Sequence, residues 1–220
     1  EANNSEFKIL LSKKPSKNRW LTTGDHPIFL DNSNAINYKP YNEIGSEVLN
    51  ERKKVILVGI AGSNNAFSLS LYNLKAYAYQ NLTIRDRCDI DVIQHPLINP
   101  GQSINKRILS DLSEKIISKR PYLIGFSCYM WNLDSFLKIA AIIKKKLPDV
   151  RILLGGPEIA TEYVQSSYFD KYPIDYCVSG EGEQTFLELL LNLENNNPAV
   201  NDIHGLSYRA NKNSEFIVTL

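Results

Sequence analysis

The sequence of 220 residues contains few cysteines, no long hydrophobic run and almost no net charge. Cys88, Cys128 and Cys177 are odd in number and far apart, which indicates neither a disulfide framework nor a metal site and predicts three reduced thiols. The formal charge of +1 gives no electrostatic reason to bind nucleic acid or an anionic membrane surface. The longest apolar run, from Val55 to Ala61, is too short to span a bilayer. With no signal-peptide pattern, we expect a cytoplasmic protein.

Familiar catalytic motifs are absent as well. Residues 61–67 contain neither GxGxxG nor GxxxxGK[ST], so a dinucleotide or nucleoside-triphosphate site is not expected there. His26 and His204 have no metal-ligating neighbours in the sequence, and we expect structural or surface roles for both. Without a nucleophile–base pair or a metal-ligand cluster, the sequence predicts no catalytic and no metal-binding residue.

Strand and helix patterns alternate from Lys54 onwards. Apolar, β-branched runs predict buried strands at 54–60, 89–95, 122–128, 150–156 and 174–180. Helical spacing of apolar residues predicts helices at 67–80, 103–119, 133–148, 161–168 and 183–193. Residues 203–209 and 215–220 are typical of a terminal hairpin.

This alternation predicts a three-layer α/β fold in which helices cover both faces of a five-stranded parallel sheet. The expected strand order is 2-1-3-4-5, the flavodoxin-like (Rossmann-like) arrangement, in which ligands bind at the carboxyl ends of the strands. We expect three parts: an irregular arm at 1–53, the α/β domain at 54–196, and a hairpin or linker at 197–220. Because the only methionine is Met130 and the chain stops in a strand-like segment, we expect a fragment of a larger protein.

Two of the loops at the predicted carboxyl edge are polar or aromatic. The loop after the first strand is small and polar, and its candidate ligand-binding residues are Gly62, Ser63 and Asn64. The loop after the third strand offers Ser127, Cys128, Tyr129 and Trp131. Ser127 can hydrogen-bond a ligand, and the two aromatic residues either cover a flat apolar ligand or pack under a neighbouring domain.

The other two loops are rich in glycine. The fourth strand ends in Gly155, Gly156, Pro157 and Glu158. Adjacent glycines let the main chain approach a bulky group, although a tight turn is the alternative. The loop after the fifth strand carries Gly180, Glu181 and Gly182, of which Glu181 is free to accept hydrogen bonds from a ligand. Together the four loops predict a broad binding cleft rather than a catalytic centre.

Three segments together resemble the N-terminal cobalamin-binding domain of B12-dependent radical SAM enzymes. They are "LIGFSCYMWNLDSFLKIAAIIKKKLPDVRILLGGPEIA", "IDYCVSGEGEQTFLELL" and "IHGLSYR", and the similarity covers about residues 54–210. The resemblance implies that Ser127, Gly155 and Gly156 line the channel for the nucleotide tail of cobalamin, with Gly180, Glu181 and Gly182 nearby.

The chain departs from the wider family at two points. Residues 61–67 contain no histidine and no DxHxxG signature, so the implied cobalamin is base-off and has no histidine ligand. No CxxxCxxC occurs, so the [4Fe–4S] cluster and S-adenosylmethionine would belong to a C-terminal radical SAM domain missing from this chain.

We therefore expect a cofactor-binding module of a radical SAM enzyme, with a methyltransferase as the favoured case. The chain itself would not be catalytic, and its partners would be the corrinoid and the radical SAM domain. The main alternative is a flavodoxin-like interaction domain without a cofactor. An independent FMN carrier is disfavoured because residues 61–67 lack a phosphate-binding run of Ser and Thr.

Overall fold

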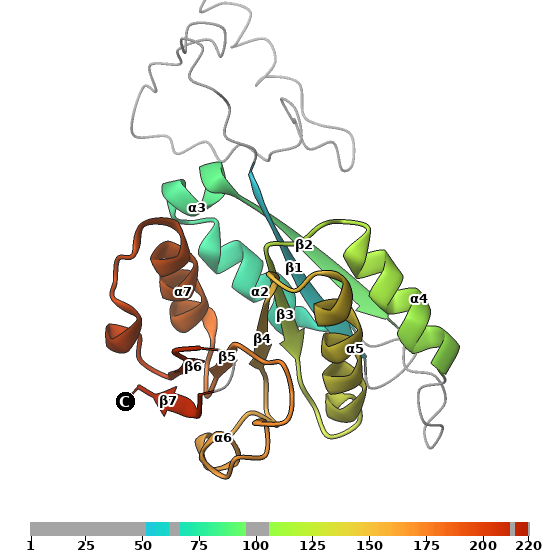
Figure 1. Ribbon diagram of the computed structural model, residues 1–220. Coiled ribbons are helices and arrows are strands. Elements are labelled where there is room, and N and C mark those ends of the chain that lie inside the picture. Colours follow the sequence, from blue (N-terminus) through green and yellow to red (C-terminus); the bar gives the residue numbers. More distant parts are fainter. Residues whose placement is uncertain (1–51, 62–66, 96–105, 212–213, 220) are drawn as a thin grey trace, which may run out of the picture. The chain divides into compact units, whose positions relative to one another are not determined.

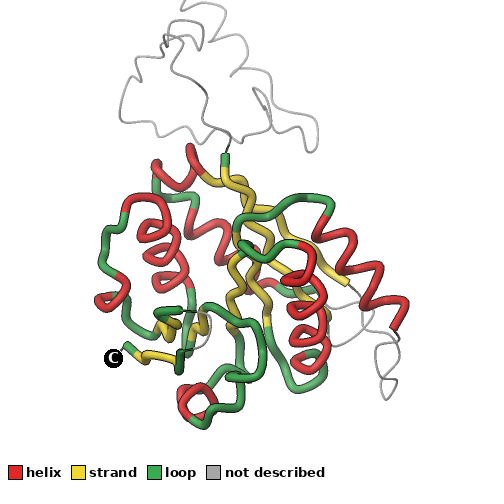
Figure 2. The backbone as a smooth tube through the Cα atoms, in the orientation of Figure 1, coloured by secondary structure: helices red, strands yellow, loops and turns green. Residues whose placement is uncertain are grey.

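The computed structural model describes residues 52–61, 67–95, 106–211 and 214–219. The predictions for residues 1–51 and for Gly62, Ser63 and Asn64 lie outside the described residues. In the described part, helices flank a central sheet on both sides, as the three-layer prediction requires (Figures 1 and 2).

The sheet contains seven strands in the order β2-β1-β3-β4-β5-β6-β7. The strands are β1 (Lys53–Ile60), β2 (Cys88–His95), β3 (Leu123–Ser127), β4 (Arg151–Gly155), β5 (Tyr176–Val178), β6 (Leu206–Arg209) and β7 (Phe216–Val218). The pairings from β2 to β5 are parallel, so the predicted order 2-1-3-4-5 is confirmed for the first five strands.

The predicted strand count of five is wrong, because the terminal hairpin belongs to the same sheet. β6 pairs antiparallel with β5, with Leu206 opposite Val178, and β7 then pairs antiparallel with β6. Pairing satisfies the backbone groups that would otherwise be free along the edge of β5. The sheet is therefore mixed rather than wholly parallel.

The described helices are α2 (Leu69–Ala78), α3 (Leu82–Arg87), α4 (Lys106–Ile117), α5 (Leu133–Lys146), α6 (Thr161–Gln165) and α7 (Glu183–Asn195), with a short 3-10 turn at Val200–Asp202. Helix α3 was not predicted, since its six residues are too short to show a period. Asn81 starts it by accepting a hydrogen bond from the backbone N–H of Ile84 at 3.3 Å.

Two apolar layers hold the helices on the sheet. Alternate residues of the central strands, such as Ile56 and Phe126, pack with helices α4 and α5 on one face. The intervening residues, such as Leu57 and Leu153, pack with α2, α3 and α7 on the other. Because side chains alternate across a strand, burial on both faces accounts for the continuous apolar runs in the sequence.

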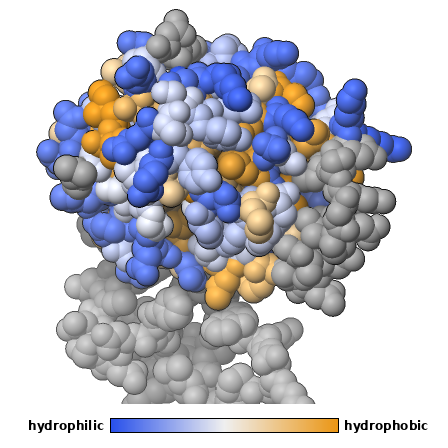
Figure 3. Space-filling view, turned by 90° about the horizontal axis from the view of Figure 1, so that it is seen from below, coloured by the Kyte–Doolittle hydropathy of each residue, from blue (hydrophilic) through white to orange (hydrophobic). Residues whose placement is uncertain are grey.

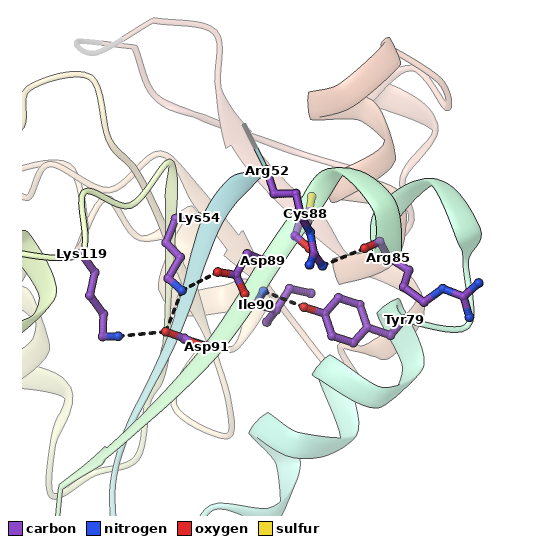
Figure 4. Close-up of polar contacts among 9 residues, drawn as sticks. All are labelled: Arg52, Lys54, Tyr79, Arg85, Cys88, Asp89, Ile90, Asp91 and Lys119. Atoms are coloured by element: carbon purple, nitrogen blue, oxygen red, sulfur yellow. Dashed lines mark hydrogen bonds and ion pairs between the residues drawn. The ribbon is translucent and has the colours of Figure 1, made fainter. Parts of the chain in front are cut away.

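Charged residues join the amino-terminal ends of β1 and β2 (Figure 4). Lys54 Nζ lies 2.6 Å from Asp89 Oδ2 and 2.8 Å from Asp91 Oδ2, and Lys119 Nζ lies 2.9 Å from Asp91 Oδ2. Burial alone would raise the pKa of Asp91, but hydrogen bonds from Lys54 and Lys119 outweigh it and lower the pKa. For Lys54, burial alone would lower the pKa, but Asp89 and Asp91 outweigh it and raise the pKa. The ion pairs favour the paired register of these two strands.

The opposite, carboxyl edge of the sheet carries the loops singled out in the sequence. β3, β4 and β5 end there, and the chain continues from them into α5, α6 and α7. In the part of the chain that the structure describes, no helix is both long and apolar enough to cross a membrane.

Candidate functional site

A cavity of about 510 Å³ opens at the carboxyl edge and extends between the sheet and helices α2 and α7. Four strands contribute to its lining: β1 through Leu57, β3 through Gly125, β4 through Leu153 and β5 through Val178. Leu74 of α2 and Phe186 of α7 cover the opposite side. The volume lies within the range of small-molecule pockets.

The floor of the cavity consists of three residues in register on adjacent strands. Gly125 lies opposite Leu57 on one side and Leu153 on the other. A Cβ atom at position 125 would lie 2.8 Å from Leu57 Cδ2, so glycine keeps the floor low between the two leucines. This floor lies two residues below the end of β3, a depth of roughly 7 Å at the usual rise of a strand.

Ser127 and Gly155 form the next level, at the strand ends. They are paired in the register of β3 and β4, and both line the cavity. Ser127 is only 7 % exposed, so most of this polar side chain is covered by its neighbours. A serine hydroxyl that lines a cavity can donate a hydrogen bond to a ligand or accept one from it.

Glycine is needed at the two adjacent positions 155 and 156 for different structural reasons. A Cβ atom at Gly155 would meet nothing closer than Val178 at 3.9 Å, so the missing side chain leaves open space in the cavity. Gly156 has φ of +104°, and a Cβ atom there would lie 2.6 Å from the carbonyl oxygen of Cys128. Gly155 therefore makes room for a ligand, whereas Gly156 is required by the turn itself.

The loop after β5 forms another wall of the opening. Gly180, Glu181 and Gly182 all line the cavity. A Cβ atom at Gly180 would have no neighbour within 4 Å, and φ there is +83°. Next to them, the Ser179 hydroxyl is buried and has no hydrogen-bond partner among the described residues. This loop therefore combines open space with an unpaired polar group.

The loop after β3 contains a stacked aromatic pair. The rings of Tyr129 and Trp131 lie 4.6 Å apart with an interplanar angle of 12°. Tyr129 lines the cavity, whereas Trp131 is not part of the described lining and donates from Nε1 to the carbonyl oxygen of Ile60 at 3.1 Å. Trp131 therefore links this loop to the end of β1.

Asn132 is a structural residue of the site that sequence reasoning missed. Its side chain is 1 % exposed, and Nδ2 donates to the carbonyl oxygens of Ile60 and Ser127, both at 3.2 Å. Its Oδ1 accepts a hydrogen bond from the N–H of Tyr129 at 2.8 Å. Asn132 thus fixes the ends of β1 and β3 relative to one another. Its position directly before a helix was the available signal.

Large apolar residues are exposed at the same edge, which Figure 3 views from below. Met130 is 81 % exposed and Trp131 43 %, and Phe67 before α2 is 58 % exposed. Exposed apolar residues around an opening are typical of a surface that contacts a ligand or another domain.

Comparison with known families identifies the segment that contains most of this site. Residues 83–190 match the family model of the B12 binding domain. This segment of the chain is similar to B12-binding domains. The match begins in α3 and ends in α7, so it includes the strand ends of β3, β4 and β5.

Two relatives of this chain are methyltransferases. The chain is 28 % identical over 169 residues to the cobalamin-dependent radical SAM methyltransferase TokK of Streptomyces tokunonensis, covering 76 % of this chain and 22 % of the relative. It is 32 % identical over 90 residues to 2-(S-pantetheinyl)-carbapenam-3-carboxylate methyltransferase of Streptantibioticus cattleyicolor, covering 40 % of this chain and 13 % of the relative.

A solved structure has the same fold. The apo form of the cobalamin-dependent S-adenosylmethionine radical enzyme OxsB gives a TM-score of 0.54 at 18 % identity. That comparison covers 77 % of this chain and 22 % of OxsB. The chain thus spans only about a fifth, or less, of the length of these proteins.

Among the described residues predicted to bind the cofactor, Cys128, Trp131 and Glu158 are not part of the cavity lining. Gly62, Ser63 and Asn64 lie outside the described residues. Pro157 is part of the lining, but Glu158 is not. Cys128 is fully buried, and its sulfur contacts the carbonyl oxygen of Phe126 at 3.6 Å, so its side chain belongs to the core.

The three cysteines are buried, and their thiols lie away from solvent. Burial raises the pKa of Cys88 to about 12, with Glu194 adding to the shift. Burial also raises the pKa of Cys128 and of Cys177, in each case well above the ordinary range. All three are free and buried, and they remain protonated at neutral pH. Across the described residues, no cluster of His, Cys, Asp and Glu could hold a metal ion.

Proposed function

We propose that the B12-binding domain holds cobalamin base-off, with the nucleotide tail inside the cavity and the corrin ring over the carboxyl edge of the sheet. Ser127, Gly155, Gly180, Glu181 and Gly182 would contact the tail and its linker. No histidine occurs in residues 61–67 or among the described cavity-lining residues. The lower face of cobalt would therefore have no histidine ligand from these loops.

One observation carries the proposal: positions without a side chain leave open space beside Ser127, a polar residue of the lining that is only 7 % exposed. Gly155 and Gly180 would place a Cβ atom in space with no contact closer than 3.9 Å and none within 4 Å, respectively. The Ser127 hydroxyl lies at the same level of the sheet as Gly155. A flat aromatic base fits between apolar walls, and the hydroxyl satisfies its ring nitrogen.

Within a full-length enzyme, the bound corrinoid would carry a methyl group from S-adenosylmethionine to a substrate. This chain would supply position and environment: the cavity would exclude water from the tail, and the exposed residues Met130 and Trp131 would be available to contact the ring. The [4Fe–4S] cluster and the S-adenosylmethionine site would belong to a separate radical SAM domain. The names of the relatives favour methyl transfer over other radical reactions.

Titration of the 220-residue chain with hydroxocobalamin tests the proposal. We expect absorbance changes typical of base-off cobalamin, saturation at one equivalent, and retention of the corrinoid through gel filtration. Cobinamide, which lacks the nucleotide tail, is the matched control ligand and should bind at least about tenfold more weakly, because the cavity then stays empty. If no corrinoid is retained at any concentration, the alternative of an interaction domain without a cofactor is favoured instead.

A further inference from the structure

The cavity is chemically uneven, and its deep part is almost wholly apolar. Leu57, Leu153, Val178 and Phe186 line it and are at most 5 % exposed. They come from three strands and one helix that pack in the same apolar layer. A group that enters this part of the cavity loses its contact with water on all of these sides.

Polar side chains in the described lining lie mostly near solvent. Ser70 and Glu181 are exposed, while Tyr129 and Glu183 are half-buried. Ser127 is the one residue of the described lining that is both polar and buried. The strand backbone offers little more, because the main-chain groups at this level pair between β3 and β4. The deep cavity can therefore satisfy about one polar atom of a ligand.

Nucleotide tails of corrinoids differ in how many polar atoms their base contains. A benzimidazole attached to ribose has one free ring nitrogen, which the Ser127 hydroxyl can satisfy. An adenine in the same position has two further ring nitrogens and an exocyclic amino group. A buried polar group without a partner loses its hydrogen bonds to water and gains none in return.

We propose that this cavity selects corrinoids with a benzimidazole base over corrinoids with a purine base. The selectivity rests on the proposed function, because it applies only if the tail occupies the cavity. Shape alone would not produce it, since both bases are flat bicyclic rings of similar size. The discrimination comes from the polar atoms that the leucine, valine and phenylalanine side chains leave unpaired.

The test is a comparison of four corrinoids on the 220-residue chain by equilibrium titration. Hydroxocobalamin and benzimidazolylcobamide should bind with similar affinity, adeninylcobamide at least about tenfold more weakly, and cobinamide weakly as well. Equal affinity for hydroxocobalamin and adeninylcobamide would overturn the selectivity and leave the proposed function intact. Equal affinity for cobinamide and hydroxocobalamin would overturn the location of the tail. Failure to bind any of the four would overturn both proposals.

A matched pair of variants locates the selectivity in the cavity. Val178 lines the cavity, and Val150 does not, yet each is 4 % exposed. Val178→Thr places a hydroxyl beside the base, so the preference for hydroxocobalamin over adeninylcobamide should fall by at least about threefold. Val150→Thr introduces the same change away from the cavity and should leave the ratio unaltered. If the folded Val178→Thr protein keeps the wild-type ratio of affinities for the two corrinoids, the proposal that the base contacts Val178 is contradicted.

Discussion

Substitutions at the two adjacent glycines should separate cofactor binding from stability. In Gly155→Leu, the Cβ atom meets Val178 only at ordinary contact distance, so the rest of the side chain extends into the cavity. We expect the free energy of unfolding to change by less than about 1 kcal/mol. Affinity for hydroxocobalamin should fall at least about tenfold, because the leucine occupies space needed by the tail.

Gly156→Ala should show the opposite pattern. At φ of +104°, an alanine is strained by about 1–3 kcal/mol. Its Cβ atom would also lie 2.6 Å from the carbonyl oxygen of Cys128, which is backbone and cannot rotate away, at a further cost of about 1–3 kcal/mol. For a domain of this size, we expect the melting temperature to drop by at least about 4 °C.

The assays are thermal unfolding by circular dichroism and titration with hydroxocobalamin, both on the same preparations. Gly155→Ala is the intermediate control, because it adds only the Cβ atom and should keep most of the affinity. Two results would refute the reasoning. One is a Gly155→Leu protein that is folded and binds as tightly as the wild type. The other is a Gly156→Ala protein that melts at the wild-type temperature.

Two further predictions concern residues outside the cavity wall. Asn132→Ala removes the side chain that hydrogen-bonds the backbone of Ser127 and Tyr129. We expect the free energy of unfolding, measured with denaturant, to fall by about 1–3 kcal/mol, and hydroxocobalamin to bind more weakly. Asn73→Ala, on an exposed part of α2, is the control, and equal effects of the two substitutions would contradict the role of Asn132. The pKa of Asp91 is lower in the folded protein than in the unfolded chain. At pH values above the pKa of the unfolded chain, the ion pairs of Asp91 therefore contribute their full stabilisation, and this contribution is lost as the pH falls through the pKa of the folded protein. Asp91→Asn should therefore lower the free energy of unfolding at pH 7, and that free energy should then decline less steeply below about pH 4. Urea unfolding at several pH values measures both effects, and the exposed Asp149→Asn should change neither. If the stability of Asp91→Asn declines in acid as steeply as that of the wild type, the role of Asp91 is contradicted.

The features that sequence reasoning predicted correctly depend on short stretches of chain. Runs such as Val55–Ile60 are apolar at every position, which marks strands covered on both faces. Because helices connect these strands, the strands are expected to run parallel in one sheet. Right-handed connections favour the observed order of the first five strands. Ser127, Gly155 and Gly180 could be placed at one edge because the carboxyl ends of parallel strands share it.

The missed features depend on contacts between distant segments. Leu57, Gly125 and Leu153 form the cavity floor only because three strands pair in one particular register. The hairpin residues Leu206 and Val218 show strand patterns, but no local signal says that they extend the main sheet. Cys128 looked available in a loop, although packing directs its thiol into the core.

The sequence by itself determined the class of fold, the edge that carries the site and the likeness to cobalamin-binding domains, because periodicity and loop composition are local properties. Only the tertiary structure decided the separate roles of the two adjacent glycines. Gly155 faces open space and Gly156 packs on the backbone of Cys128, a difference set by φ and by a loop from another strand. The depth and apolar character of the cavity were decided in the same way, since they arise where β1, β3, β4 and β5 meet α2 and α7.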